Sequence, residues 1–163
     1  MAAAPYHFSP LAAADLPLIR RWLAQPHVAQ WWPHGDAELE TIRGHINDAA
    51  IDPFLVHMHD RPIGYLQCYD PHAEAAHPFR DQPIGTRGID QFIGEPELID
   101  RGHGSGLTRT FVERLFAAGA PLVLTDPDPA NTRAVRAYEK AGFQPDRLID
   151  TPWGRTILMV CTA

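Results

Sequence analysis

The sequence predicts a mixed α/β fold, and the order of its periodic segments is the main reason. Two segments with helical spacing of apolar residues precede any long strand, and strands and helices alternate only in the middle of the chain. A strand hairpin then closes the sequence. This order favours a mixed sheet over a fully parallel one, because parallel strands need a crossover between them. At 163 residues the chain has a common single-domain size, so we expect one domain over 1–163.

The composition excludes several classes of protein. Hydrophobic residues make up 45% and charged residues 21%, which is ordinary for a soluble protein, and no apolar run approaches the ~18 residues that span a bilayer. The N-terminal stretch lacks the basic start and apolar core of a signal peptide, and two cysteines make no disulfide framework. We therefore expect a cytoplasmic protein with no membrane partner.

The charges are unevenly distributed. A net charge of −6 argues against a nucleic-acid partner. Residues 1–100 carry six Arg and 14 Asp or Glu, whereas residues 101–140 carry six Arg or Lys and four Asp or Glu. Ordinary surface variation can produce this pattern, and the alternative is a cation bound near the acidic part and an anion near the basic part.

Each segment of the first half has a local signal. Residues 6–8 are predicted to form a short strand. Asp15 can cap a helix that has Pro17 in its first turn, and Asp36 is a second candidate cap. Residues 53–70 alternate in polarity on either side of a turn and indicate a hairpin.

The second half alternates strands with helices. A Pro- and His-rich stretch without a period, 71–86, predicts a long loop, and "RGIDQFIG" then predicts a strand. After a glycine-rich stretch comes a third helix, and a short strand in "PLVLTDPDP" leads to a fourth helix capped by Asn131 and ended by Gly142. A hairpin that turns near 152–154 closes the chain. The apolar face predicted for the third helix consists of Leu107, Phe111, Leu115 and Ala118.

The stretch "RGHGSG", Arg101 to Gly106, lies between the fourth predicted strand and the third helix. Unpaired amides and the helix dipole make such a junction suitable for an anion. A P-loop is excluded because the stretch has no lysine, and the dinucleotide fingerprint fails because Leu107 stands where a third glycine is needed. From these residues alone, a flexible turn that binds nothing stays open.

Two motifs in the correct order resemble the GCN5-related N-acetyltransferase (GNAT) superfamily. The acetyl-CoA loop of that family reads Arg or Gln, any, any, Gly, any, Gly or Ala, as Arg101, Gly104 and Gly106 do. An asparagine and a tyrosine seven residues later follow the next strand, as Asn131 and Tyr138 do. The chain is most similar to the aminoglycoside 6'-N-acetyltransferases, through "WW", "PIGY", "RGIDQ", "TDP" and "N.RA...YEKAGF".

The resemblance implies a fold and a reaction. The fold would be the GNAT fold, with about six or seven mostly antiparallel strands splayed between strands 4 and 5 and about four flanking helices. The reaction would be direct transfer of acetyl from acetyl-CoA to a primary amine, with the 6'-amine of an aminoglycoside as the best-matching acceptor. The alternatives are a siderophore-type hydroxylamine, a protein N-terminus, or a non-catalytic protein that binds acyl-CoA or a drug. A monomer or a homodimer is expected.

The resemblance also assigns site residues. Tyr138 would protonate the leaving thiolate and Asp126 would accept the amine's proton, although spacing alone suits a core tyrosine and a turn-forming aspartate. The cofactor-binding residues would be Gln91, Phe92, Ile93, Arg101, Gly102, His103, Gly104, Ser105, Gly106, Leu107, Asn131 and Tyr138. The substrate-binding residues would be Trp31, Trp32, Tyr65, Asp70, Asp90 and Asp126. One of the two adjacent tryptophans could equally belong to the core.

The histidines and cysteines suggest no further chemistry. His57 and His59 would share one face of a strand, but they lack Cys or carboxylate partners at ligand spacing, so we predict no metal. Cys68 and Cys161 lie in apolar strands and are predicted to be buried small residues rather than acyl-carrying nucleophiles.

Overall fold

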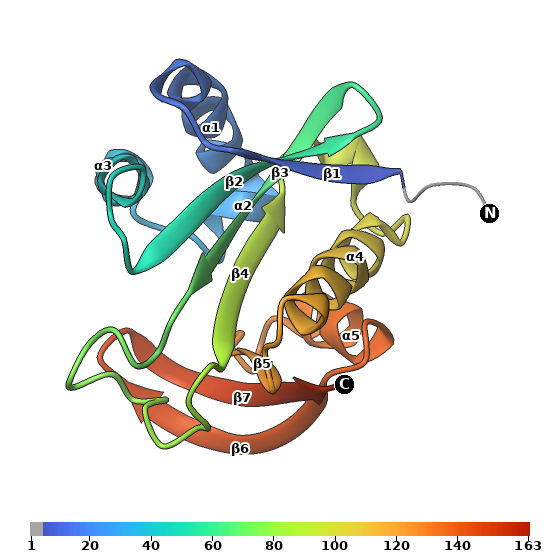
Figure 1. The fold of residues 1–163 in the computed structure, drawn as a ribbon. Coiled ribbons are helices and arrows are strands. Elements are labelled where there is room, and N and C mark those ends of the chain that lie inside the picture. Colours follow the sequence, from blue (N-terminus) through green and yellow to red (C-terminus); the bar gives the residue numbers. More distant parts are fainter. Residues whose placement is uncertain (1–4) are drawn as a thin grey trace. The chain divides into compact units, whose positions relative to one another are not determined.

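A seven-stranded sheet organises the fold in a computed structural model that describes residues 5–163 (Figure 1). Residues 1–4 of the predicted domain lie outside the described residues. The strands, in the order β1-β2-β3-β4-β5-β7-β6, are β1 Tyr6–Pro10, β2 Ile51–Met58, β3 Arg61–Tyr69, β4 Arg87–Ile93, β5 Leu122–Thr125, β7 Gly154–Thr162 and β6 Gln144–Thr151. β4 and β5 are parallel, whereas β1 with β2, β5 with β7 and β6 with β7 are antiparallel. The predicted mixed, mostly antiparallel sheet is confirmed.

The four predicted helices are present, and a fifth, short one was not predicted. The helices are α1 Leu16–Leu23, α2 Pro26–Ala29, α3 Gly35–His45, α4 His103–Ala117 and α5 Thr132–Lys140. Two 3-10 segments cover Ala13–Asp15 and Pro96–Leu98. The unpredicted helix α2 starts at a proline after an extended Gln25, and its four residues are too few to show a period. Within residues 5–163, none of the helices has the length and apolar content to cross a membrane.

Four local predictions were wrong. The Asp15 carboxylate accepts the Ala12 N–H (2.9 Å) across a 3-10 turn rather than capping α1. Asp36 lies in the first turn of α3 instead of at its cap, because that helix begins at Gly35 and His34 occupies the cap position. Ala118 follows the end of α4 and is exposed. His59 lies in the hairpin turn with φ 53°, so it shares no strand face with His57.

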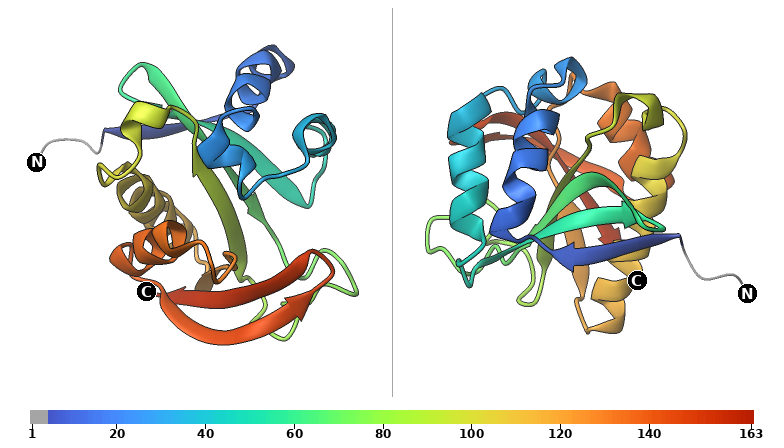
Figure 2. Two further views of the ribbon diagram at one scale, coloured as in Figure 1. Left: turned by 180° about the vertical axis from the view of Figure 1, so that it is seen from behind. Right: turned by 90° about the horizontal axis from the view of Figure 1, so that it is seen from above.

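The chain divides into two compact units. The first unit comprises Met1–Gln67 and Gln91–His103, and the second comprises Cys68–Asp90 and Gly104–Ala163. In the first unit α1 and α3 lie side by side (Figure 2). The expectation of a single domain stays a prediction.

Each unit has its own buried cluster of side chains. The first contains Leu11, Leu16, Ile19, Trp22, Leu23, Val28, Leu39, Ile42, Leu55, Tyr65 and Phe92. The second contains Phe79, Leu124 and Leu158, with Tyr69, Leu122, Ile149 and Val160 packed against them. Cys68 and Cys161 are buried, as predicted, and burial raises the pKa of the Cys161 thiol.

Candidate active site

Two carboxylates of the second unit meet where β4 and β5 run in parallel. The backbone register pairs Arg87 with Val123 and Gly88 with Leu124. Asp90 lies in β4 and Asp126 directly follows β5, and the Asp90 charge acts on the Asp126 carboxyl. The hydroxyl of Thr125, just before Asp126, is buried and donates to the carbonyl of Ile89 (2.9 Å), which ties the two strands together at this point. The sequence prediction placed both carboxylates in the site, and the structure brings them together.

The environment of Asp126 makes it a base of unusual strength for a carboxylate. Burial is the larger cause and the neighbouring Asp90 carboxylate the second, and together they raise the pKa of Asp126 from its usual 3.8 to about 8. The indole N–H of Trp153 donates to Asp126 Oδ2 (2.8 Å) and offsets part of this shift, because the hydrogen bond favours the charged carboxylate. A pKa near the working pH suits a group that must take up a proton and release it again.

The partly buried Tyr69 and the buried Tyr138 belong to the same electrostatic neighbourhood. Burial, followed by the Asp90 and Asp126 charges, raises the pKa of Tyr69 well above its usual 10.0, and Tyr138 contributes a smaller part. The Tyr69 ring covers the Gly88 backbone so closely that a Cβ there would lie 2.1 Å from its Cζ. Tyr138 is buried on α5, with its ring edge-on to Phe143 at a centroid distance of 5.4 Å. Tyr69 therefore remains a neutral phenol, which can donate a hydrogen bond.

The stability of the fold should depend on the charge of Asp126. The folded-state pKa lies above the unfolded one, so the stability due to the protonated carboxyl is full below pH ~4 and is lost as the pH rises towards 8. In the Asp126→Asn variant this side chain is neutral at every pH. We therefore expect the Tm of the variant, relative to that of the natural chain, to increase as the pH rises. A gain of about 1 kcal/mol at pH 9 corresponds to roughly 2–4 °C in Tm.

Thermal unfolding of both proteins at intervals from pH 5 to pH 9 measures this difference. Asp128→Asn is the matched control, since Asp128 is exposed and its Oδ1 accepts the Ala130 N–H, a bond that an asparagine can also make. A Tm difference for Asp126→Asn that stays constant with pH would contradict the pKa assigned to Asp126.

The glycine-rich stretch forms a helix start rather than a separate loop. Asp100 and Gly102 have positive φ angles (59° and 83°), and α4 begins at the next residue, His103. Gly104 and Gly106 therefore lie in the first turn of α4, where their lack of a side chain lets a ligand approach the backbone. The predicted anion site at this junction fits the observed backbone.

Two further predicted cofactor residues have contacts within their own units. Tyr6 Oη and His103 Nδ1 lie 2.8 Å apart in the first unit, so the imidazole at the start of α4 is held by a side chain of β1. In the second unit, the Asn131 side chain accepts the Ala134 N–H (3.2 Å) and caps α5, as predicted. The role of Asn131 in holding pantetheine stays a prediction.

The aromatic residues of the first unit pack mainly on one another. Trp32 contacts Tyr65 and Phe92 edge-on, with centroid distances of 6.1 and 5.2 Å. Tyr65 is fully buried, and its hydroxyl donates to Gln67 Oε1 (2.9 Å). Trp31 is partly buried. The structure thus gives Trp32 and Tyr65 a packing role, and their contact with a substrate stays a prediction.

The strand segment 91–93 combines apolar burial with one unpaired acceptor. Phe92 and Ile93 are buried, and the imidazole of His27 bonds to the Ile93 carbonyl (2.8 Å). Among residues 5–163, Gln91 Oε1 is one of a small set of buried side-chain polar atoms without a hydrogen-bond partner. A buried acceptor of this kind is costly unless a ligand donor reaches it.

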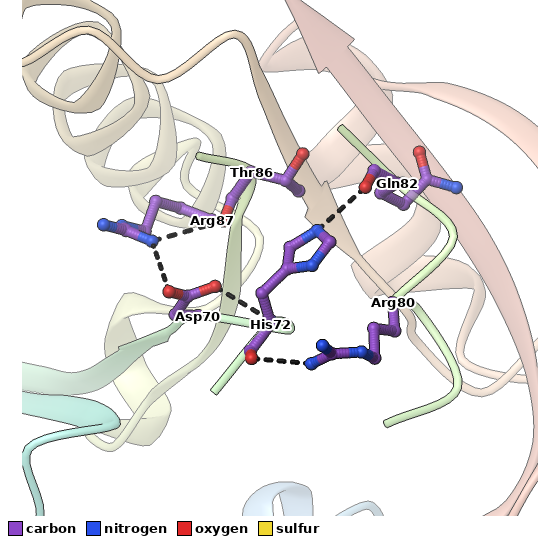
Figure 3. Close-up of polar contacts among 6 residues, drawn as sticks. All are labelled: Asp70, His72, Arg80, Gln82, Thr86 and Arg87. Atoms are coloured by element: carbon purple, nitrogen blue, oxygen red, sulfur yellow. Dashed lines mark hydrogen bonds and ion pairs between the residues drawn. The ribbon is translucent and has the colours of Figure 1, made fainter. Parts of the chain in front are cut away.

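The long loop after β3 is held by its own polar contacts (Figure 3). Asp70 accepts the backbone N–H of His72 (2.8 Å) and pairs with Arg87 (3.4 Å). The His72 imidazole bonds to the Gln82 carbonyl (2.8 Å), while Arg80 donates to the His72 carbonyl (2.7 Å). Asp70, a predicted substrate residue, thus has a structural role, and its contact with a substrate stays a prediction.

Trp153 is a site residue that sequence reasoning missed. It lies in the turn between β6 and β7, far along the chain from its partner Asp126. The available signal in the sequence was a tryptophan in a predicted tight turn, but its hydrogen-bond partner depends on how the strands pair. Among the described residues there is no group of three or more His, Cys, Asp and Glu side chains arranged to hold a metal ion.

A family model described as "Acetyltransferase (GNAT) domain" matches residues 12–151. The chain belongs to this family. It is 31% identical over 157 residues to aminoglycoside N(6')-acetyltransferase type 1 of Klebsiella pneumoniae. This alignment covers 91% of this chain and 78% of the relative. It is 43% identical over 79 residues to a kanamycin resistance protein of Rhizobium radiobacter, which covers 48% of this chain and 73% of that protein.

Solved structures of GNAT relatives share the fold. A structure of the aminoglycoside acetyltransferase AAC(6')-Ib with coenzyme A and kanamycin superposes with a TM-score of 0.87 at 30% identity, covering 96% of this chain and 94% of that one. Another structure of AAC(6')-Ib, with acetyl-CoA among its ligands, has the same TM-score and identity and covers 93% of that chain. The predicted GNAT fold is confirmed.

Proposed function

We propose that the protein transfers acetyl from acetyl-CoA to the 6'-amine of an aminoglycoside. The observation that carries this proposal is the carboxylate pair Asp90 and Asp126, with the pKa of Asp126 raised to about 8, in a chain of the GNAT family. The alignment to the Klebsiella aminoglycoside N(6')-acetyltransferase over 91% of the chain supports the choice of acceptor. Acetyl-CoA supplies the acetyl group as its thioester.

The carboxylate pair can both hold an ammonium and remove its proton. A cationic amine beside Asp126 favours the ionised carboxylate and lowers the pKa of Asp126, whereas attack on the thioester requires a neutral amine. Asp126 then takes the proton, directly or through a water, while Asp90 retains the substrate. The excess of Asp and Glu in residues 1–100 suits a polycationic acceptor.

The residues proposed to contact acetyl-CoA are Gln91, Phe92, Ile93, Arg101, Gly102, His103, Gly104, Ser105, Gly106, Leu107, Asn131 and Tyr138. The unpaired Gln91 acceptor and the glycine-rich first turn of α4 fit a ligand with amide donors and a pyrophosphate. Tyr138 would give its proton to the sulfur that leaves.

Turnover with a panel of amines tests the proposal. Purified protein is incubated with acetyl-CoA and kanamycin, and thiol release is measured together with the mass of the acceptor. The matched control is an aminoglycoside with a hydroxyl in place of the 6'-amine. We expect one acetyl group on the first compound and none at the 6' position of the second. Release of thiol without any change in acceptor mass would contradict the proposal.

A second candidate acceptor is a hydroxylated diamine. The chain is 24% identical over 130 residues to an N-hydroxyputrescine acetyltransferase of Acinetobacter baumannii, and the match covers 77% of this chain and 60% of that enzyme. The same assay with N-hydroxyputrescine separates the two candidates by their kcat/KM. The monomeric or dimeric state, the cytoplasmic location and the absence of nucleic-acid or membrane partners stay predictions.

A further inference from the structure

The β6–β7 turn of the second unit brings an indole to the carboxylate of Asp126. The Trp153 Nε1–H donates to Asp126 Oδ2 at 2.8 Å. The turn itself is fixed, because the Thr151 hydroxyl donates to the Gly154 carbonyl (2.6 Å) and Gly154 adopts φ 123°. The donor that faces the proposed base is therefore held on a defined backbone.

The long loop after β3 supports the other side of this indole. The Trp153 ring contacts His77 at a centroid distance of 5.8 Å and Phe79 edge-on at 6.2 Å. Phe79 is fully buried, and its N–H donates to His77 Nδ1 (3.1 Å), so the orientation of the imidazole is also set. The loop thus packs against the indole ring of Trp153, which in turn donates the hydrogen bond to Asp126.

We propose that Trp153 is a positioning residue for Asp126. The indole N–H of Trp153 sets both the orientation and the protonation of the Asp126 carboxyl group. The role in catalysis rests on the proposed function, in which Asp126 accepts the proton of the amine. The side chain of Trp153 is 55% exposed, so its placement is poorly explained by hydrophobic burial alone. The Asp126 carboxylate faces the like charge of Asp90, so its ionised form needs stabilisation. The indole N–H of Trp153, which donates to this carboxylate, supplies it.

Trp153→Phe isolates the hydrogen bond, because it keeps an aromatic ring against His77 and Phe79 and removes the N–H. We expect the acidic limb of the kcat/KM profile to move to higher pH by about 1 unit. The variant would then have a roughly tenfold lower kcat/KM at pH 7 and the natural value at high pH. Leu148→Ala is the control, since Leu148 is 58% exposed on β6 and should leave the profile in place. A loss that is equal at every pH would show that Trp153 only supports the fold.

The pKa of Asp126, read from the ¹³C shift of its carboxyl group, tests the inference without any turnover. The other titratable groups facing this carboxyl and its indole are Asp90 of β4, Tyr69 of β3 and His77, and burial lowers the pKa of His77 below its usual 6.5, away from the range of interest. We expect Trp153→Phe to raise the midpoint by about 1 unit. An unchanged midpoint overturns the role of Trp153 even in an active enzyme, whereas a raised midpoint in a protein that acetylates no amine upholds its effect on Asp126 and overturns only the proposed function.

Discussion

Asp126→Asn is expected to lower kcat/KM for the amine acceptor by about 10²- to 10⁴-fold at pH 9, the range that a general base contributes. The asparagine can still fill the space and accept the indole N–H of Trp153, but it can take up no proton. Since the natural carboxyl is itself protonated below its pKa of about 8, the gap between the two proteins should narrow as the pH falls towards 6. The pH dependence separates loss of a base from loss of structure.

The measurement is the kcat/KM profile from pH 6 to pH 9, with the affinity for coenzyme A determined in parallel by calorimetry. Coenzyme A should bind both proteins equally, because Asp126 is assigned to the amine side. Asp128→Asn removes the same charge two residues away and should leave the profile unchanged. If Asp126→Asn keeps the full rate at pH 9, the proton acceptor is another group and Asp126 serves only the turn before Pro127.

Local signals in the sequence predicted the elements that carry the site. Asn131 and Gly142 bound α5 as predicted, because a side-chain acceptor and a residue with φ 105° are requirements of single helix ends. Asp90 and Asp126 were assigned to one site by the resemblance to the GNAT family. Asp90 lies in β4 and Asp126 directly follows β5, the strand that pairs with β4 in parallel.

Interactions that depend on tertiary packing were beyond the sequence. Asp15 and Asp36 have the residue type of a helix cap. However, the Asp15 carboxylate accepts a backbone N–H and the Asp36 carboxylate forms an ion pair. Asp70 is likewise taken up by Arg87 and the loop backbone. The pairing of Trp153 with Asp126 joins a turn to a strand end 27 residues apart, and no local pattern specifies that contact.

Tyr138→Phe should lower kcat by about 10²-fold at pH 7, because the leaving thiolate loses its proton donor. The variant keeps the ring and its edge-on contact with Phe143, so the thermal stability and the affinity for coenzyme A should change little. A thiol with a pKa near 8.5 leaves more readily as the free thiolate once the pH exceeds that value, so the deficit should shrink between pH 7 and pH 9.5. This trend is opposite to the one expected for Asp126→Asn, whose deficit grows with pH. Rates for both variants across one pH series therefore assign the acid and the base separately. If the Tyr138→Phe protein has the natural rate at pH 7, Tyr138 has only the packing role that its burial already shows.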